Sequence, residues 1–201
     1  MTRDEFIQII GLGREQNGVE FKSAGLRTDK QLLARVIRAA IGMSNRRYGG
    51  IVIVGINEDG EGNPVLVGLN PTELKSWKYD DFSDSLSSYA DPSITFMTEE
   101  FEFESKTFLV VNIDEFGDIP IICKRDFPGV LRQGAVYVRT RRKPETSDIP
   151  THEDMRQLLD LAVEKRLRQF TRTASAVGLS LERERDQSDE DQFNRQLGEI
   201  K

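Results

Sequence analysis

Cysteine and histidine are almost missing from this sequence, which has one of each, Cys123 and His152, among 201 residues. A single cysteine cannot form an internal disulfide, so the fold does not depend on an oxidising compartment. A structural zinc site needs four nitrogen or sulfur ligands in one neighbourhood, which two residues cannot supply, so we expect no zinc. Catalysis by a Cys–His or Ser–His–Asp set would have to use His152. That residue lies where a helix is predicted to begin, and we interpret it as a surface histidine.

Long apolar runs are also missing. No stretch of about twenty apolar residues could span a bilayer, and residues 1–5 lack the basic-then-apolar order of a secretory signal. We therefore expect a cytoplasmic protein that does not enter membranes. A Gly-x-x-x-x-Gly-Lys-Ser/Thr phosphate loop is absent from the sequence as well, which argues against a Walker-type ATP site.

The composition is that of a globular domain, with 37% hydrophobic and 31% charged residues in a chain long enough to bury one core. The 34 acidic residues outnumber the 28 basic ones, and the formal net charge is -6. This excess argues against a protein that coats DNA generally, but it allows a local basic patch. Nucleic-acid binding must therefore be assigned to particular segments.

Hydrophobic periodicity predicts an α+β fold in which helices flank a mixed sheet. Thr28 and Gln31 fit a capping box at the start of the clearest helix. Residues 51–56 form a β-branched run of the kind found in strands buried on both faces. Thr151 is the predicted N-cap of a long C-terminal helix. The predicted helices cover residues 3–12, 28–45, 79–89 and 151–173, and the predicted strands cover 19–22, 51–56, 64–69, 94–103, 107–113, 119–123 and 135–139.

The sequence divides into three predicted parts. Residues 1–150 form the folded domain, residues 151–173 form an amphipathic helix, and residues 174–201 form a polar, flexible tail. The tail is too highly charged to bury a core of its own. A protein partner could dock on its few apolar residues, which are Leu179, Leu181, Phe193, Leu197 and Ile200.

Acidic residues gather around two of the predicted strands. Alternation along residues 19–22 places Glu20 and Lys22 on the same face, and Glu15 lies just before that strand. Glu58 and Asp59 follow the apolar run, so the acids can converge if both strands share a sheet. Carboxylates can hold Mg²⁺ or Mn²⁺ for phosphodiester cleavage, and a lysine can stabilise the anionic transition state. The other interpretation is a solvated strand face, because such pairs are common in a chain this rich in charge.

An ordered set of segments resembles a known family. The set is Glu15, Val19-Glu-Phe-Lys22, the helix ending near Asn45, Gly49-Gly50, Ile51-Val-Ile-Val-Gly-Ile56 and Glu58-Asp-Gly60. It resembles the AlbA-like domain of the Schlafen family, and the resemblance runs to Tyr137-Val-Arg139, which makes it cover roughly residues 10–142. The resemblance implies a single mixed-sheet Schlafen/AlbA-like domain.

The family includes RNA endonucleases that cut transfer and ribosomal RNA with three acidic residues. The resemblance therefore implies a metal-dependent endoribonuclease acting on structured, tRNA-like RNA, in stress or phage defence. The three acids match Glu15, Glu20 and Glu58 in this sequence. Members often have aspartate at the last position, so Asp59 is the alternative third ligand.

This sequence departs from the animal Schlafen nucleases in two ways. Those nucleases contain a zinc site, which this chain cannot build, and their nuclease region has two related lobes where this chain has one. Because two copies could recreate a two-lobed surface, we predict a homodimer. Many bacterial proteins with this domain are described as DNA-binding or ATP-binding regulators. The alternative function is thus a non-catalytic nucleic-acid-binding regulatory or partner-recruiting module.

Basic residues offer candidate phosphate contacts, because such contacts supply most non-specific affinity for nucleic acid. The densest basic segment is residues 139–143. Solvated loops are the other interpretation of each of these residues. The candidates are Arg46, Arg47, Lys124, Arg125, Arg132, Arg139, Arg141, Arg142 and Lys143.

Overall fold

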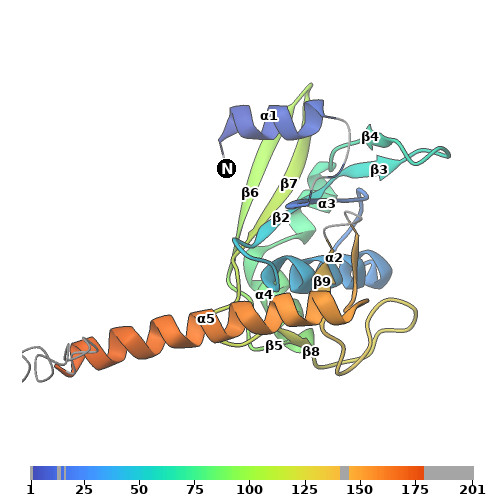
Figure 1. The fold of residues 1–201 in the computed structure, drawn as a ribbon. Helices are drawn as coiled ribbons and strands as arrows, with labels where there is room; N and C mark the ends of the chain where they lie inside the picture. Colours follow the sequence, from blue (N-terminus) through green and yellow to red (C-terminus); the bar gives the residue numbers. More distant parts are fainter. Residues whose placement is uncertain (1, 13–14, 16, 141–144, 179–201) are drawn as a thin grey trace, which may run out of the picture. The chain divides into compact units, whose positions relative to one another are not determined.

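The computed structural model describes residues 2–12, 15, 17–140 and 145–178. The chain forms two compact units, residues 1–163 and 164–201. The first unit holds the described strands and both hydrophobic cores, and it has the α+β architecture that the sequence predicts (Figure 1).

The main sheet has four strands in the order β1-β2-β7-β6. Strand β1 pairs in parallel with β2, and the other two pairings are antiparallel. The apolar run is an interior strand, as predicted, because β2 lies between β1 and β7. The strands are β1 (Val19–Lys22), β2 (Gly50–Val54), β6 (Phe96–Phe103) and β7 (Lys106–Ile113).

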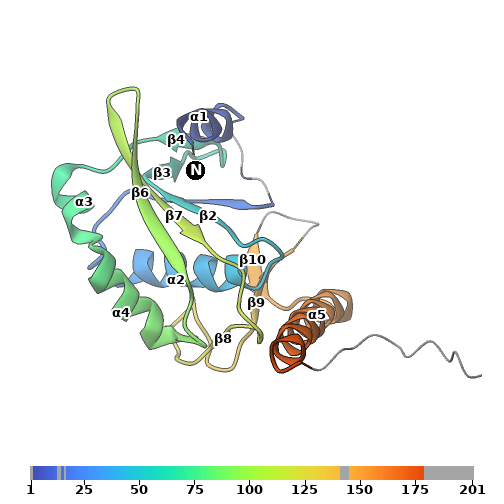
Figure 2. The same cartoon turned by 90° about the vertical axis from the view of Figure 1, so that its left-hand side faces the viewer.

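Helices cover both faces of this sheet (Figure 2). Helix α2 (Lys30–Ser44) packs on one face and helix α1 (Arg3–Gly11) on the other. Strand β2 sends Val52 and Val54 into the core on the α2 side, and Ile53 into the core beside α1. Burial on both faces explains why this strand has no polar positions.

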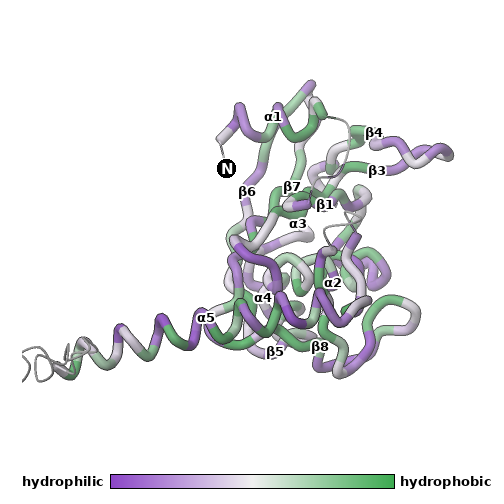
Figure 3. Tube along the Cα trace, viewed as in Figure 1, coloured by the Kyte–Doolittle hydropathy of each residue, from purple (hydrophilic) through white to green (hydrophobic). Residues whose placement is uncertain are grey.

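The predicted strand at residues 51–56 is interrupted by Gly55, whose φ is 118°. A Cβ atom at this position would lie 3.0 Å from the Phe108 ring and 3.2 Å from the Gly68 Cα, so the close approach favours glycine. The chain continues as β3 (Ile56–Glu58), which forms the expected hairpin with β4 (Pro64–Leu66). The turn between them is hydrophilic (Figure 3).

The start of α2 differs by one residue from the prediction. Asp29 caps the helix, because its Oδ1 accepts hydrogen bonds from the backbone N–H groups of Gln31 at 2.9 Å and Leu32 at 3.2 Å. The predicted capping box at Thr28 is therefore wrong, since the adjacent aspartate is the residue that reaches the free N–H groups of the first turn.

Shorter elements complete the first unit. The predicted helix at residues 79–89 is confirmed, and a preceding helix was missed although Asn70 and Glu73 form its capping box. The predicted strands at 119–123 and 135–139 are each shorter. These elements are α3 (Pro71–Ser76), α4 (Tyr79–Tyr89), β5 (Ala90–Asp91), β8 (Ile122–Cys123), β9 (Tyr137–Arg139) and β10 (Thr146–Asp148).

Strand β9 is held against the C-terminal end of α2 by Asn45. The Asn45 side-chain amide donates to the carbonyl oxygens of Ile121 at 2.8 Å and Tyr137 at 2.9 Å, and its oxygen accepts from the Ile121 N–H at 2.7 Å. Strand β9 pairs antiparallel with β10, which places Arg139 opposite Thr146. This packing brings two distant parts of the sequence beside β1.

Helix α5 (His152–Ala176) begins after Thr151, whose hydroxyl accepts from the Asp154 N–H at 3.1 Å, as a cap should. It ends three residues beyond the predicted boundary at 173. The predicted tail lies mostly in residues 179–201, which are outside the described residues. Among the helices that are described, none combines the length and the apolar character needed to cross a membrane.

Candidate functional site

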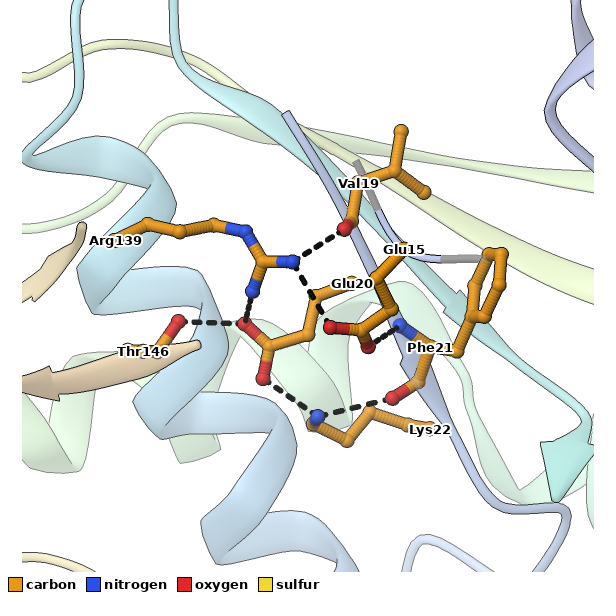
Figure 4. Close-up of polar contacts among 7 residues, drawn as sticks. All are labelled: Glu15, Val19, Glu20, Phe21, Lys22, Arg139 and Thr146. Carbon is orange, nitrogen blue, oxygen red and sulfur yellow. Dashed lines mark hydrogen bonds and ion pairs between the residues drawn. The ribbon is translucent and has the colours of Figure 1, made fainter. Parts of the chain in front are cut away.

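Three of the predicted site residues lie together beside strand β1 (Figure 4). Glu20 and Lys22 are on the strand, and Glu15 is in the segment that leads into it. Arg139, at the end of β9, and Thr146, at the start of β10, approach from the other side. The predicted clustering of Glu15, Glu20 and Lys22 is therefore present, with two partners that are distant in sequence.

Arg139 bridges the two glutamates. Its Nη1 lies 2.7 Å from Glu20 Oε2, and its Nη2 lies 2.9 Å from Glu15 Oε2. Nη2 also donates to the Val19 carbonyl oxygen at 2.6 Å. The Arg139 side chain is 0% exposed and the Glu20 side chain 5%, so this ion pair is shielded from water and salt. Arg139 consequently does not offer its guanidinium to a bound phosphate in this structure.

The other carboxylate oxygen of each glutamate also has a partner, and Glu20 Oε2 has a second one. Lys22 Nζ lies 2.5 Å from Glu20 Oε1, and the Thr146 hydroxyl donates to Glu20 Oε2 at 2.5 Å. Glu15 Oε1 accepts from the Phe21 N–H at 2.6 Å. All four oxygens thus accept hydrogen bonds or face a cation, and the formal charges of two carboxylates and two cations cancel.

As arranged, this cluster does not fit a divalent ion. A hard cation needs several free oxygen ligands, whereas the oxygens of Glu15 and Glu20 already face Arg139, Lys22 and neutral donors. In the part of the chain that the structure describes, no group of three or more His, Cys, Asp or Glu residues could hold a metal ion.

The two candidates for a third acidic ligand lie in the β3–β4 hairpin. Glu58 is exposed and pairs with Pro64. Asp59 shapes the turn, because its Oδ1 accepts from the N–H groups of Glu61 at 2.9 Å and Asn63 at 2.8 Å. The backbone hydrogen bond from Asn63 is the main cause that lowers the pKa of Asp59. The structure thus gives Asp59 a role in the turn.

Apart from the buried Arg139, the predicted basic residues that the structure describes are dispersed over several segments. Arg46 and Arg47 follow α2, and Lys124 and Arg125 follow β8, with the Arg125 guanidinium 5.7 Å from the centre of the Tyr89 ring. Arg132 forms an ion pair with Asp148. The remaining three candidates, Arg141, Arg142 and Lys143, lie outside the described residues.

A cavity of about 410 Å³ opens beside the C-terminal end of α2. Arg46, Arg47 and Tyr48 line it, and so does Thr140, which directly follows Arg139. Tyr48 is 85% exposed. The two arginines were predicted from the sequence, but the tyrosine was not. The sequence feature that could have indicated Tyr48 is its position between two arginines and Gly49-Gly50, which places an aromatic residue on a tight turn.

The fold and this set of residues define a small α+β domain with a mixed sheet between helices. The family described as "Schlafen, AlbA_2" matches residues 15–147, and the chain belongs to this family. Membership indicates a nucleic-acid-related domain. It also confirms the resemblance inferred from the ordered segments around Glu15 and Glu20.

Two solved structures are similar to this chain at low sequence identity. One is the DIP2311 protein from Corynebacterium diphtheriae, with 18% identity and a TM-score of 0.45, covering 73% of this chain and 27% of that chain. This chain therefore spans about a quarter of that protein. Another is the N-terminal domain of a putative ATP-dependent DNA helicase RecG-related protein from Nitrosomonas europaea. It has 19% identity and a TM-score of 0.48, covering 76% of this chain and 98% of that domain.

A comparison of this chain with curated proteins found no match.

Proposed function

We propose that this domain binds nucleic acid, with RNA as the expected ligand, at the cavity beside the end of α2. The observation that carries the proposal is the triplet Arg46, Arg47 and Tyr48, which lines a cavity of about 410 Å³. Arginine guanidinium groups recognise phosphate and stack on bases, and an exposed aromatic ring stacks on bases. Family membership supports the same role.

In this proposal the acidic cluster is structural. Arg139 joins strand β9 to Glu15 and Glu20, and Thr140, the next residue, lines the cavity. The cluster thus fixes the backbone at which the basic segment 139–143 begins. Because its formal charges cancel, it adds no net repulsion toward a nearby phosphate.

A binding measurement with labelled RNA tests this proposal. Replacing Arg46 and Arg47 together by alanine should weaken binding by about tenfold and lower the dependence on salt, because fewer phosphates are neutralised. The matched control is Lys75→Ala, which removes an exposed charge on α3. Equal affinity of the double variant and the control would contradict the proposed surface.

The basic segment beyond Arg139 is a further part of the proposed surface. Arg141, Arg142 and Lys143 should be replaced together by alanine while Arg139 is kept, since Arg139 holds the glutamates. We expect weaker RNA binding and a shallower salt dependence. Unchanged binding would remove these three residues from the proposed surface.

A second candidate function is metal-dependent endoribonuclease activity on structured, tRNA-like RNA, as in stress or phage defence. The observation that favours it is the contact between Glu20 and Lys22, with Glu15 bound to the same arginine. This function would require Arg139 to release the carboxylates, and Glu58 or Asp59 to approach them.

Total transfer RNA incubated with purified protein tests this second candidate, in Mg²⁺ or Mn²⁺ and in chelator. Cleavage should need the divalent ion, and Lys22→Ala should slow it. Glu58→Gln and Asp59→Asn should differ, with the more damaging change identifying the third acid. Cleavage that persists in chelator, or that Glu20→Gln leaves equally fast in folded protein, would contradict this candidate.

A further inference from the structure

We propose that the cavity beside Tyr48 takes one unpaired nucleobase, so the domain prefers a single-stranded segment of RNA to a continuous duplex. This inference rests on the proposed nucleic-acid binding and names what that site recognises. Two observations support it: Tyr48 is exposed on a fixed turn, and the cavity is lined by residues of both charges.

Tyr48 is held out from the surface by a fixed turn. The residue is 85% exposed, the largest exposed fraction among the exposed large hydrophobic residues of the described chain. Its φ of 70° is uncommon for a residue with a side chain, and such a conformation costs roughly 1 kcal/mol or more. The Tyr48 N–H donates to Glu115 Oε2 at 2.7 Å. The backbone is therefore anchored while the ring remains available for stacking.

Gly49 fixes the other side of this turn. Its φ is 65°, and a Cβ atom there would lie 2.0 Å from the Ile113 carbonyl oxygen, so the backbone packs directly against the end of β7. The Gly49 N–H donates to the Arg46 carbonyl oxygen at 3.0 Å, and its own carbonyl oxygen accepts from Arg46 Nη1 at 2.8 Å. A ring on a preorganised turn loses little conformational freedom when a ligand binds.

The cavity wall carries both signs of charge. Arg46 and Arg47 line one part, while Asp154, Gln157 and Asp160 of α5 line another. Carboxylates repel phosphates, so a surface meant only for a duplex backbone would not be expected to include two of them. Carboxylate and amide oxygens instead accept hydrogen bonds from the amino groups of bases. The tyrosine ring can stack on the base, the guanidinium groups can bind the phosphate, and the acceptors can bind the base edge. Together they suit one nucleotide with its base and its phosphate.

Asn45 lines the same cavity but is not part of the proposed recognition. Its side-chain nitrogen donates to the Ile121 and Tyr137 carbonyl oxygens, and its oxygen accepts from the Ile121 N–H. Gln157 and Asp160 are exposed, so we assign the reading of the base edge to them.

The cavity is large enough to hold a single base. Pockets for small ligands have volumes of roughly 300–1,000 Å³, and the value of about 410 Å³ lies at the lower end of that range. A base inside a continuous duplex is paired and stacked on both faces, so it cannot stack on Tyr48. Unpaired bases in loops, bulges and ends can be splayed out and stacked on aromatic side chains.

Fluorescence anisotropy with three labelled RNAs of one length tests this inference. They are a single strand, the same strand in a duplex, and the same strand with abasic sites, which keeps the phosphates and removes bases. We expect the 201-residue chain to bind the single strand about tenfold more tightly than the other two, in keeping with the contribution of base stacking.

Variants at Tyr48 assign any preference to the ring. Tyr48→Asn removes the ring but suits a positive φ, and it should lower affinity for the single strand by about tenfold. Tyr48→Phe keeps the ring and should bind like the original protein. Equal affinity for all three RNAs would overturn the base pocket while leaving nucleic-acid binding in place. No binding to any of them would instead overturn the proposed function itself.

Discussion

Arg139 connects three parts of the chain through one buried side chain. It bonds Glu20 and Glu15, which lie 119 and 124 residues earlier, as well as the Val19 carbonyl oxygen. Removing one partner of a buried ion pair leaves the other charge without compensation, and this is far more costly than losing a surface pair. The stability of the domain should therefore depend on this residue.

We predict that Arg139→Ala lowers the free energy of unfolding by about 3 kcal/mol, because buried Glu20 keeps only Lys22 as a cation and Glu15 loses its cation. Arg139→Lys should recover only part of this, since an ammonium group cannot form the two-pronged contact. Urea unfolding measures both changes. The control is Arg156→Ala, an exposed residue of α5, which should stay within about 0.5 kcal/mol. An Arg139→Ala variant as stable as that control would contradict the structural role of the cluster.

Local sequence was enough to predict part of this site. Strand alternation places Glu20 beside Lys22, and the position of Glu15 just before the strand places it nearby, as the structure shows. The burial of Arg139 could not be predicted, because its partners are more than a hundred residues away and its own neighbours form a basic run typical of a surface. Tyr48 was missed because a lone tyrosine has no periodic pattern.

At the scale of elements, the ionisation of Asp59 makes the stability of the β3–β4 turn depend on pH. The Asn63 backbone N–H is the main cause that lowers its pKa in the folded protein. A carboxylate with a lowered folded pKa stabilises the fold at neutral pH, and this contribution is lost as pH falls through that value.

We therefore predict that the hairpin keeps its turn at neutral pH and loosens only below the ordinary titration range of aspartate. NMR titration of the Glu61 and Asn63 amide signals, whose N–H groups donate to Asp59, measures this directly. In the Asp59→Asn variant the same signals should not follow this titration. A midpoint at or above the ordinary value for aspartate would count against the hydrogen-bonded turn.

The elements that the sequence predicted best are those with strong periodicity. Helix α4 falls at the expected residues, and the apolar run is the interior strand β2. Gly55 ends β2 because of packing against Phe108 and Gly68, and no local pattern shows that contact. Strand β5 was not predicted for a similar reason, since its two residues are defined by pairing with the distant β8. Strand β10 was not predicted because its three residues, Thr146–Asp148, form no apolar run.

For the whole molecule, the cores indicate which part of the chain is needed for folding. The residues that form the two hydrophobic cores lie between Phe6 and Ala162. We predict that a chain ending at Gly178 melts cooperatively, within about 2 °C of the whole chain, because the sequence removed is too highly charged to bury a core of its own. Calorimetry of both chains measures this. Loss of a cooperative transition would show that residues 179–201 contribute to folding.

We also predict that the protein is a homodimer, because the matched domain is a single lobe and two copies would present a larger surface to RNA. Light scattering should give roughly twice the 22.9 kDa mass of one chain, with and without RNA. A strict monomer under both conditions would contradict this prediction.

We propose that the domain binds RNA through its basic and aromatic turn, while Arg139 and Lys22 neutralise Glu15 and Glu20 within the protein. The most direct test is RNA affinity measured in chelator over a range of salt concentrations. We predict that binding persists without divalent ions and weakens as salt rises, by a logarithmic slope of about 0.7 for each phosphate contacted in single-stranded RNA. Binding that disappears in chelator, or that does not depend on salt, would contradict the account.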